Sequence, residues 1–120
     1  MKITRSSIWL ANLGKPDAKT SIQKNTRPVI IVSNDMCNVH SPVITAVPLT
    51  TRNKNNLPTH VIIPMSTGLL EQSIALVEQS MPLDRHNLIK EIGYCNNNIM
   101  MQINKAILIQ NGIIAVCGVA

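Results

Sequence analysis

Arg27 stands at the entrance of a predicted strand, and its side chain is well suited to binding a phosphate group. Val29–Val32 is a run of β-branched residues that is typical of a buried strand. Pro28 is tolerated where a strand begins, and the polar residues 33–35 favour a turn after it. A guanidinium fixed at the end of a rigid strand presents a planar fork of N–H donors to phosphate oxygens. On the local pattern alone, an arginine in a surface salt bridge fits equally well.

Four other short motifs accompany Thr26-Arg27-Pro28-Val29, and all of them occur in a fixed order. They are Ile8–Leu13, Ser33–Asp35, Leu57–Val61 (Leu-Pro-Thr-His-Val) and Val77–Gln79 (Val-Glu-Gln). In this order and spacing they resemble the MazF/PemK family of toxin endoribonucleases. The resemblance extends from about Ile8 to the end of a predicted helix near Gln110. Each motif is weak by itself, but several in register are hard to obtain by chance.

The resemblance implies a catalytic pair. The family has an arginine before the Pro-Val strand and a threonine at the end of the next strand, which correspond to Arg27 and Thr50. The loop that follows is one residue shorter here, so Thr51 is the alternative register. His60 is a possible catalytic base, because histidine is the residue type most often used as a general base, although a single histidine on a strand is more often structural.

The chemistry implied by this family needs no metal. The 2′-hydroxyl of RNA attacks the adjacent phosphate and leaves a 2′,3′-cyclic phosphate and a 5′-hydroxyl, provided that protons can move and that donors stabilise the phosphorane. DNA has no 2′-hydroxyl and cannot react in this way. Arg27 is a poor base because a guanidinium group does not readily give up its proton. We therefore assign Arg27 to phosphorane stabilisation and Thr50 to hydrogen bonding or proton relay.

The resemblance also implies RNA contacts in the polar loop 14–26, in the loop 51–56 and around the end of a later strand. These candidates are Ser21, Gln23, Lys24, Asn34, Arg52, Lys54, Glu78 and Gln79. Glu78 and Gln79 can read base edges, but they could equally brace the barrel. The chain departs from the family pattern at Ser6-Ser7, which replace Gly-Asp, and at Ile22 and Lys24, which replace Glu and Gly. Met81 replaces an arginine. Because the acid missing at Ile22 is a candidate for base reading, we expect a cleavage sequence different from that of better-known relatives.

Composition and charge narrow the classes of function. Residues 1–60 hold eight basic and two acidic side chains, a net +6, whereas residues 61–120 hold three and four, a net −1. A basic half suggests a polyanionic partner, although a basic surface also serves solubility. Trp9 and Tyr94 are the only aromatic residues, which argues against a module that stacks several bases.

The cysteines and the hydropathy exclude other classes. Cys37, Cys95 and Cys117 form no CxxC pair, so we expect no metal site, no disulfide framework and no cofactor. The thiols are typical of a reduced, cytoplasmic protein. No run approaches the roughly 18 apolar residues of a membrane span.

The pattern of apolar residues predicts a mostly β, α+β protein with a single domain over residues 1–120. We expect strands at 8–13, 29–32, 42–50, 59–64, 73–80 and 90–94, and a loop at 35–41. Pro48 implies that the third strand is an edge or is bulged near its end. The resemblance implies more: a small, SH3-like, partly open antiparallel barrel with a C-terminal helix, of the CcdB/PemK kind.

One helix is predicted over 97–110, because Asn96 and its two following asparagines favour an N-terminal cap and Gly112 favours a stop. Its core stripe is Ile99, Met100, Ile103, Ala106 and Ile107. Met101 and Leu108 lie on the opposite face and suggest a partner surface, and the resemblance implies a homodimer. The tail 113–120 is uncharged and either adds a strand or packs on a partner.

Three functions fit these observations. The first is a sequence-selective endoribonuclease toxin that cleaves single-stranded mRNA and is neutralised by a cognate antitoxin protein. The second is a CcdB-like inhibitor of gyrase on the same fold, without enzymatic activity. The third is a small basic barrel that binds RNA without cutting it. Arg27 and Thr50 in register favour the nuclease.

Overall fold

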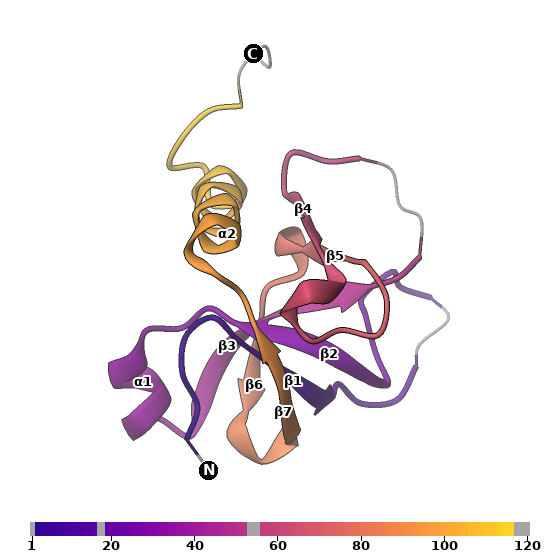
Figure 1. Cartoon of the computed structure of the whole chain (residues 1–120), viewed down its shortest axis with the longest axis vertical. Helices are drawn as coiled ribbons and strands as arrows, with labels where there is room; N and C mark the ends of the chain where they lie inside the picture. Colours follow the sequence, from indigo (N-terminus) through magenta and orange to yellow (C-terminus); the bar gives the residue numbers. More distant parts are fainter. Residues whose placement is uncertain (1, 17–18, 53–55, 117–120) are drawn as a thin grey trace.

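The computed structural model describes residues 2–16, 19–52 and 56–116, and β-strands dominate these residues (Figure 1). The strands are β1 (Ser7–Asn12), β2 (Thr26–Ile31), β3 (Val43–Thr50), β4 (His60–Ile63), β5 (Ser73–Leu76), β6 (Met81–Asp84) and β7 (Leu88–Tyr94). The α-helices are α1 (Asp35–His40) and α2 (Asn97–Gln110). Short 3₁₀ turns are η1 (Met65–Thr67), η2 (Val77–Gln79) and η3 (Arg85–Asn87).

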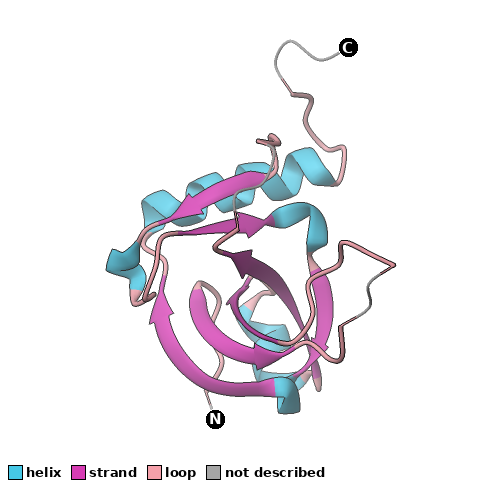
Figure 2. Ribbon diagram, turned by 90° about the vertical axis from the view of Figure 1, so that its right-hand side faces the viewer, coloured by secondary structure: helices cyan, strands magenta, loops and turns pink. Residues whose placement is uncertain are grey.

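All strand pairs are antiparallel, and the order is β4-β5-β3-β2-β1-β7 with β6 beside β3. The strands curve into a barrel-like wall that is not closed, and α2 lies across one end of it (Figure 2). The predicted fold, a partly open antiparallel barrel with a C-terminal helix, is thus confirmed.

Pro48 predicted that the third strand is an edge or is bulged near its end. The strand β3 as a whole is central in the sheet, but Pro48 itself has a neighbour on one side only. Residues 43–46 of β3 pair with β6, and Leu49 and Thr50 pair with β5. Pro48 falls between these two ladders, where β3 passes from one partner to the other, and it pairs with Val29 on the other side. An interval without a neighbour on one side is a place where a sheet tolerates proline.

The strand β2 begins at Thr26, earlier than the predicted start at Val29, so that Pro28 lies within it. Pro28 pairs with Leu10 of β1, whereas β3 joins β2 only from Val29 onward. Pro28 therefore occupies a stretch with a partner on one side alone, which is the edge-like position that proline tolerates. The consequence is that Arg27 belongs to a strand and is held by the sheet.

Side chains of β1 and β2 alternate between two cores. Ile8 and Ile30 pack in a cluster with α2, which contributes Ile99, Met100, Ile103 and Ala106. Trp9 and Val29, the next residues along each strand, pack in a second cluster with β6 and the start of β7. This alternation places Arg27 on the face of Val29 and places Pro28 on the face of Ile30.

The turn η1 packs against the end of β7 through two glycines. A Cβ atom at Gly93 would lie 1.8 Å from the carbonyl oxygen of Thr67, and one at Gly68 would lie 2.3 Å from that of Ile92. Gly68 also has a φ of +114°, which an L side chain rarely adopts. The two backbones meet only because neither residue has a side chain, and this contact narrows the gap in the barrel.

The helix α2 has the predicted bounds. Asn96 Oδ1 accepts a hydrogen bond from the N–H of Ile99 at 2.9 Å, which is the expected cap. After the helix, the N–H groups of Ile113 and Ile114 donate to the carbonyl of Leu108 at 2.9 and 3.3 Å. Residues 113–116 form no strand, and the rest of the predicted tail lies outside the described residues. None of the described helices is long and apolar enough to cross a membrane.

Two predicted elements need correction, and a third element was not predicted. Residues 35–40, predicted as loop, form α1, because Asn34 Oδ1 caps the N–H of Cys37 at 2.8 Å. The fifth strand ends at Leu76 rather than at residue 80, and Val77–Gln79 form the turn η2. The strand β6 was missed because it has four residues, one of them Pro82, and lacks a clear alternation of its own.

Candidate functional site

Arg27 lines a small cavity at the start of β2. The cavity has a volume of about 310 Å³, and its wall is polar and basic. It is lined by Pro16, Thr20, Ser21, Ile22, Gln23, Lys24, Asn25, Arg27 and Arg52. Three of these residues are cations and none of the described lining residues is a carboxylate, so the cavity attracts anions.

The Arg27 side chain is partly buried and anchored at one atom. Its Nε donates a hydrogen bond to the carbonyl oxygen of Lys24 at 2.7 Å. Neither of the ion pairs among the described residues involves Arg27, because these join His60 to Glu78 and His86 to Asp84. Among the described residues Arg27 therefore forms no salt bridge, and its two terminal nitrogens have no described hydrogen-bond partner.

Thr50 ends β3 at the same end of the β2–β3 pair as Arg27. The register pairs Val29 with Pro48, and continuing it by two residues sets Arg27 across from Thr50. Thr50 is 2% exposed, and its hydroxyl oxygen accepts the N–H of Arg52 at 3.2 Å. Its own proton has no acceptor among the described residues. Thr51, the alternative register, is exposed and lines a different cavity.

His60 lies apart from Arg27 in this chain. Its Nε2 contacts Glu78 Oε2 at 2.9 Å, and Glu78 Oε1 accepts the hydroxyl of Thr59 at 2.9 Å. The N–H of Leu57 points at His60 Nδ1 at 3.4 Å, so both ring nitrogens have a partner within the chain. The cavity beside His60 is bounded by α2 and residues 115–116 and shares no lining residue with that of Arg27.

The predicted RNA contacts in loop 14–26 differ in exposure. Ser21 is exposed and Lys24 is partly buried, but Gln23 is only 6% exposed and its Oε1 has no partner among the described residues. Gln79 Oε1 accepts the backbone N–H of Gln23 at 2.9 Å, and Gln79 Nε2 donates to the carbonyl of Ser21 at 3.1 Å. The Gln79 amide thus binds this loop.

The remaining candidates are dispersed. Arg52 lines the Arg27 cavity, and Lys54 lies outside the described residues. Asn34 follows β2 at the end opposite Arg27 and caps α1. Both carboxylate oxygens of Glu78 already have partners, the Thr59 hydroxyl and His60 Nε2. One cavity therefore holds five of the candidates, namely Ser21, Gln23, Lys24, Arg27 and Arg52. Thr50 does not line this cavity but ends β3 at the same end of the β2–β3 pair, and Asn34 and His60 lie elsewhere.

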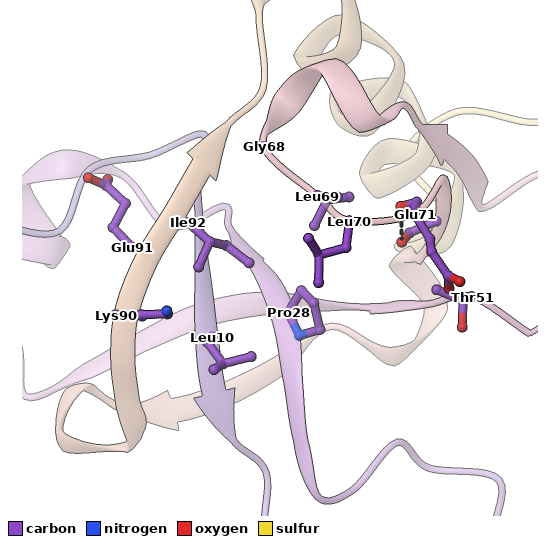
Figure 3. A pocket seen from close by; sticks show the side chains of 11 residues that line it. Leu10, Pro28, Thr51, Gly68, Leu69, Leu70, Glu71, Lys90, Glu91 and Ile92 are labelled. Carbon is purple, nitrogen blue, oxygen red and sulfur yellow. Dashed lines mark hydrogen bonds between the residues drawn. The ribbon is translucent and has the colours of Figure 1, made fainter.

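A second, more apolar cavity was not predicted from the sequence. It has a volume of about 750 Å³ and lies between β1, β2, β7 and the segment after η1 (Figure 3). Leu10, Pro28, Leu69 and Ile92 are among its apolar lining residues, and the charged lining residues are Glu71, Lys90 and Glu91. The strand alternation that puts Pro28 on the opposite face from Arg27 is the signal that separates this cavity from the basic one.

No group of three or more His, Cys, Asp or Glu residues in the described ranges is arranged to hold a metal ion. The side chains that line the basic cavity offer cationic and neutral N–H donors and hydroxyl groups. Such a set binds a phosphate and stabilises added negative charge on it.

Comparison with known proteins gives a consistent result. The family model described as the PemK-like, MazF-like toxin of type II toxin-antitoxin systems matches residues 4–110. A curated protein of Staphylococcus saprophyticus, Endoribonuclease MazF, is 36% identical over 111 residues, which are 91% of this chain and 91% of that protein.

Two solved structures share the fold. One is an endoribonuclease from a mycobacterial species in complex with its cognate antitoxin, with a TM-score of 0.79, 24% identity, and coverage of 95% of this chain and 99% of that chain. The other is MazF from Deinococcus radiodurans, with a TM-score of 0.79, 19% identity, and coverage of 93% and 98%. At these identities the likeness is one of fold. The family match and the curated relative go further, and the chain belongs to the family of PemK-like, MazF-like toxins of type II toxin-antitoxin systems.

Proposed function

We propose that this protein is a metal-independent, sequence-selective endoribonuclease toxin that cleaves single-stranded mRNA in the cytoplasm. The observation that carries the proposal is the placement of Arg27 and Thr50 at one end of the β2–β3 pair, with Arg27 in a cavity lined by cations and no described carboxylate. The relative at 36% identity, which is named Endoribonuclease MazF, supports the same activity.

The reaction is a transesterification within the RNA. The ribose 2′-oxygen forms a bond to phosphorus while the bond from phosphorus to the 5′-oxygen breaks, leaving a 2′,3′-cyclic phosphate and a 5′-hydroxyl. Negative charge grows on the phosphoryl oxygens in the transition state, so preorganised donors there accelerate the step. Arg27 supplies them from its terminal nitrogens, because Nε is already bonded to the Lys24 carbonyl.

Thr50 acts beside Arg27. Its oxygen accepts the Arg52 N–H, which leaves its proton to donate to the phosphate or to relay the proton that the 2′-hydroxyl loses. Because Thr50 is 2% exposed, we assign the larger share of charge stabilisation to Arg27. His60 faces another cavity, so we give it no step, and His60→Asn should reduce cleavage far less than a change at Arg27.

The partners follow from the basic cavity and from the solved relatives. A mycobacterial relative was solved in complex with its cognate antitoxin, and we propose that this chain, as a homodimer, is likewise neutralised by an antitoxin protein. An acidic, partly disordered segment that folds on binding would cover Lys24, Arg27 and Arg52. Deleting that acidic segment should abolish inhibition.

The test is incubation of the purified protein with RNA in EDTA, with the matching DNA as control. We expect RNA fragments that end in 2′,3′-cyclic phosphate and 5′-hydroxyl groups, and intact DNA. A strict requirement for added metal would contradict the mechanism. Intact RNA under all conditions would instead favour a CcdB-like gyrase inhibitor or a barrel that binds RNA without cleaving it, which gyrase inhibition and RNA-binding assays would separate.

A further inference from the structure

The turn η2 holds the loop 14–26 through the side chain of Gln79. One amide makes both contacts: its oxygen accepts the N–H of Gln23 at 2.9 Å and its nitrogen donates to the carbonyl of Ser21 at 3.1 Å. The partners are 56 and 58 residues away in the sequence. A donor and an acceptor on one planar group fix both the position and the orientation of the segment.

The same loop holds the guanidinium of Arg27. The carbonyl of Lys24, the residue after Gln23, accepts Arg27 Nε at 2.7 Å. The base of the loop is fixed separately, because Asn25 exchanges backbone hydrogen bonds with Leu13 and Gly14 at 2.8 Å. Hydrogen bonds and one short stretch of backbone therefore connect Gln79 to Arg27 without a gap.

We propose that Gln79 is a positioning residue, which fixes residues 21–24 and, through the Lys24 carbonyl, the orientation of the Arg27 guanidinium. This role rests on the proposed function and replaces the predicted reading of RNA bases by Gln79. Its physical basis is that misplacing a catalytic group by about 1 Å can cost 10²-fold in rate. If the loop that carries Lys24 were flexible, the carbonyl that accepts the Arg27 Nε hydrogen bond would not keep a fixed position.

The first measurement is hydrogen exchange by NMR, which requires no activity. In Gln79→Ala we expect the protection factor of the Gln23 backbone N–H against exchange to fall about fivefold, since one hydrogen bond with a net contribution of about 1 kcal/mol is lost. The Arg27 Nε–H should exchange faster as well. The Asn25 amide, bonded to the Gly14 carbonyl, should stay unchanged and serves as the internal control. Gln79→Glu keeps an acceptor for Gln23 and should preserve its protection.

The second measurement is steady-state cleavage of an RNA oligonucleotide. Gln79→Ala should lower kcat by about 10- to 100-fold with a smaller change in KM, because a mispositioned donor acts on the transition state. Gln79→Glu, which retains one of the two contacts, should fall between Gln79→Ala and the wild type. Ser80→Ala is the matched control, because it removes a hydroxyl that donates to the Val77 carbonyl at 2.6 Å next to Gln79. It leaves both hydrogen bonds of the Gln79 amide in place, so it should keep the wild-type kcat.

Several outcomes would overturn the proposal. Unchanged exchange at Gln23 in Gln79→Ala would show that the amide holds nothing. A wild-type kcat in Gln79→Ala, together with lost protection of the Gln23 amide, would show that the two Gln79 hydrogen bonds do not affect catalysis. A changed cleavage sequence at unchanged kcat would restore base reading. If the wild type leaves RNA intact, the proposed function fails, while exchange at Gln23 and at Arg27 Nε still decides whether Gln79 holds them.

Discussion

At the scale of single residues, the chemistry of Arg27 depends on which of its nitrogens remain free. Nε is bonded to the Lys24 carbonyl, and no carboxylate among the described residues pairs with the guanidinium. The terminal nitrogens can therefore bind two phosphoryl oxygens at once. A lysine at this position would keep the charge but would lose both the fork and the Nε anchor.

We therefore expect Arg27→Lys to cleave RNA almost as slowly as Arg27→Ala, about 10²- to 10³-fold below the wild type. Both variants should remain folded, because the side chain is only partly buried and takes part in no described ion pair. Single-turnover cleavage and thermal melting measure the two effects. An active Arg27→Lys would reduce Arg27 to a point charge, and a large fall in melting temperature for Arg27→Ala would show a structural role.

Cys95 gives a prediction for pH. Burial raises the pKa of its thiol from the ordinary value of 9.0 to about 11. Because the folded pKa lies above the unfolded one, the stability linked to this thiol is complete below pH 9 and is lost as pH rises toward 11. Urea midpoints between pH 8 and 11 should therefore fall more steeply in the wild type than in Cys95→Ala. Equal slopes would mean that the Cys95 thiol does not titrate in this way.

At the scale of elements, the close backbone contact between η1 and β7 is the one we expect to be most sensitive to an added side chain. Gly93→Ala would place its Cβ against the carbonyl oxygen of Thr67. Because this is a contact with backbone and not with a flexible side chain, the two backbones must separate. Gly112→Ala is the matched control, since nothing lies within 4 Å and only the φ of +72° opposes it.

We expect Gly93→Ala to destabilise the protein by several kcal/mol, beyond the 1–3 kcal/mol that is typical of overpacking. Gly112→Ala should cost only about 1 kcal/mol, for the left-handed backbone. Urea denaturation of the two variants measures the difference. Equal urea midpoints for Gly93→Ala and Gly112→Ala would show that η1 can move away from β7 with little loss in the free energy of unfolding.

Much of this element structure could be predicted from local patterns, and the failures have physical reasons. The asparagine cap and the 3.6-residue stripe fixed α2, and β-branched runs indicated β2 and β4. The helix α1 is only six residues long and depends on the cap at Asn34. The strand β6 exists because β3 offers it a partner, which no local pattern in Met81–Asp84 reveals.

The site could be predicted only in part for a related reason. The family resemblance singled out Arg27 and Thr50, and the sheet register places both at the same end of the β2–β3 pair. The burial of Gln23 and its bond to Gln79 depend on how a loop folds back over a turn 56 residues later. Such long-range contacts leave no periodic signal, which is why Gln79 was predicted to face RNA.

At the scale of the whole molecule, α2 carries an outer apolar face that the described part of the chain leaves exposed. Met101 is 69% exposed and Leu108, two turns along the same face, is 37% exposed. The tail folds back at Leu108 and adds Ile113, which is 67% exposed. A grouped apolar surface of this kind marks an interaction site more often than isolated exposed residues do.

We expect this surface to belong to the homodimer interface, so that light scattering at micromolar concentration gives the mass of two chains. Leu108→Lys should shift the protein toward monomer, because a charge buried without a partner opposes association. Gln110→Lys adds the same charge to the same end of α2 on another, exposed face and should leave the dimer intact. A wild-type monomer would contradict the homodimer. Equal effects of the two substitutions would show that net charge, and not the face formed by Met101, Leu108 and Ile113, controls association.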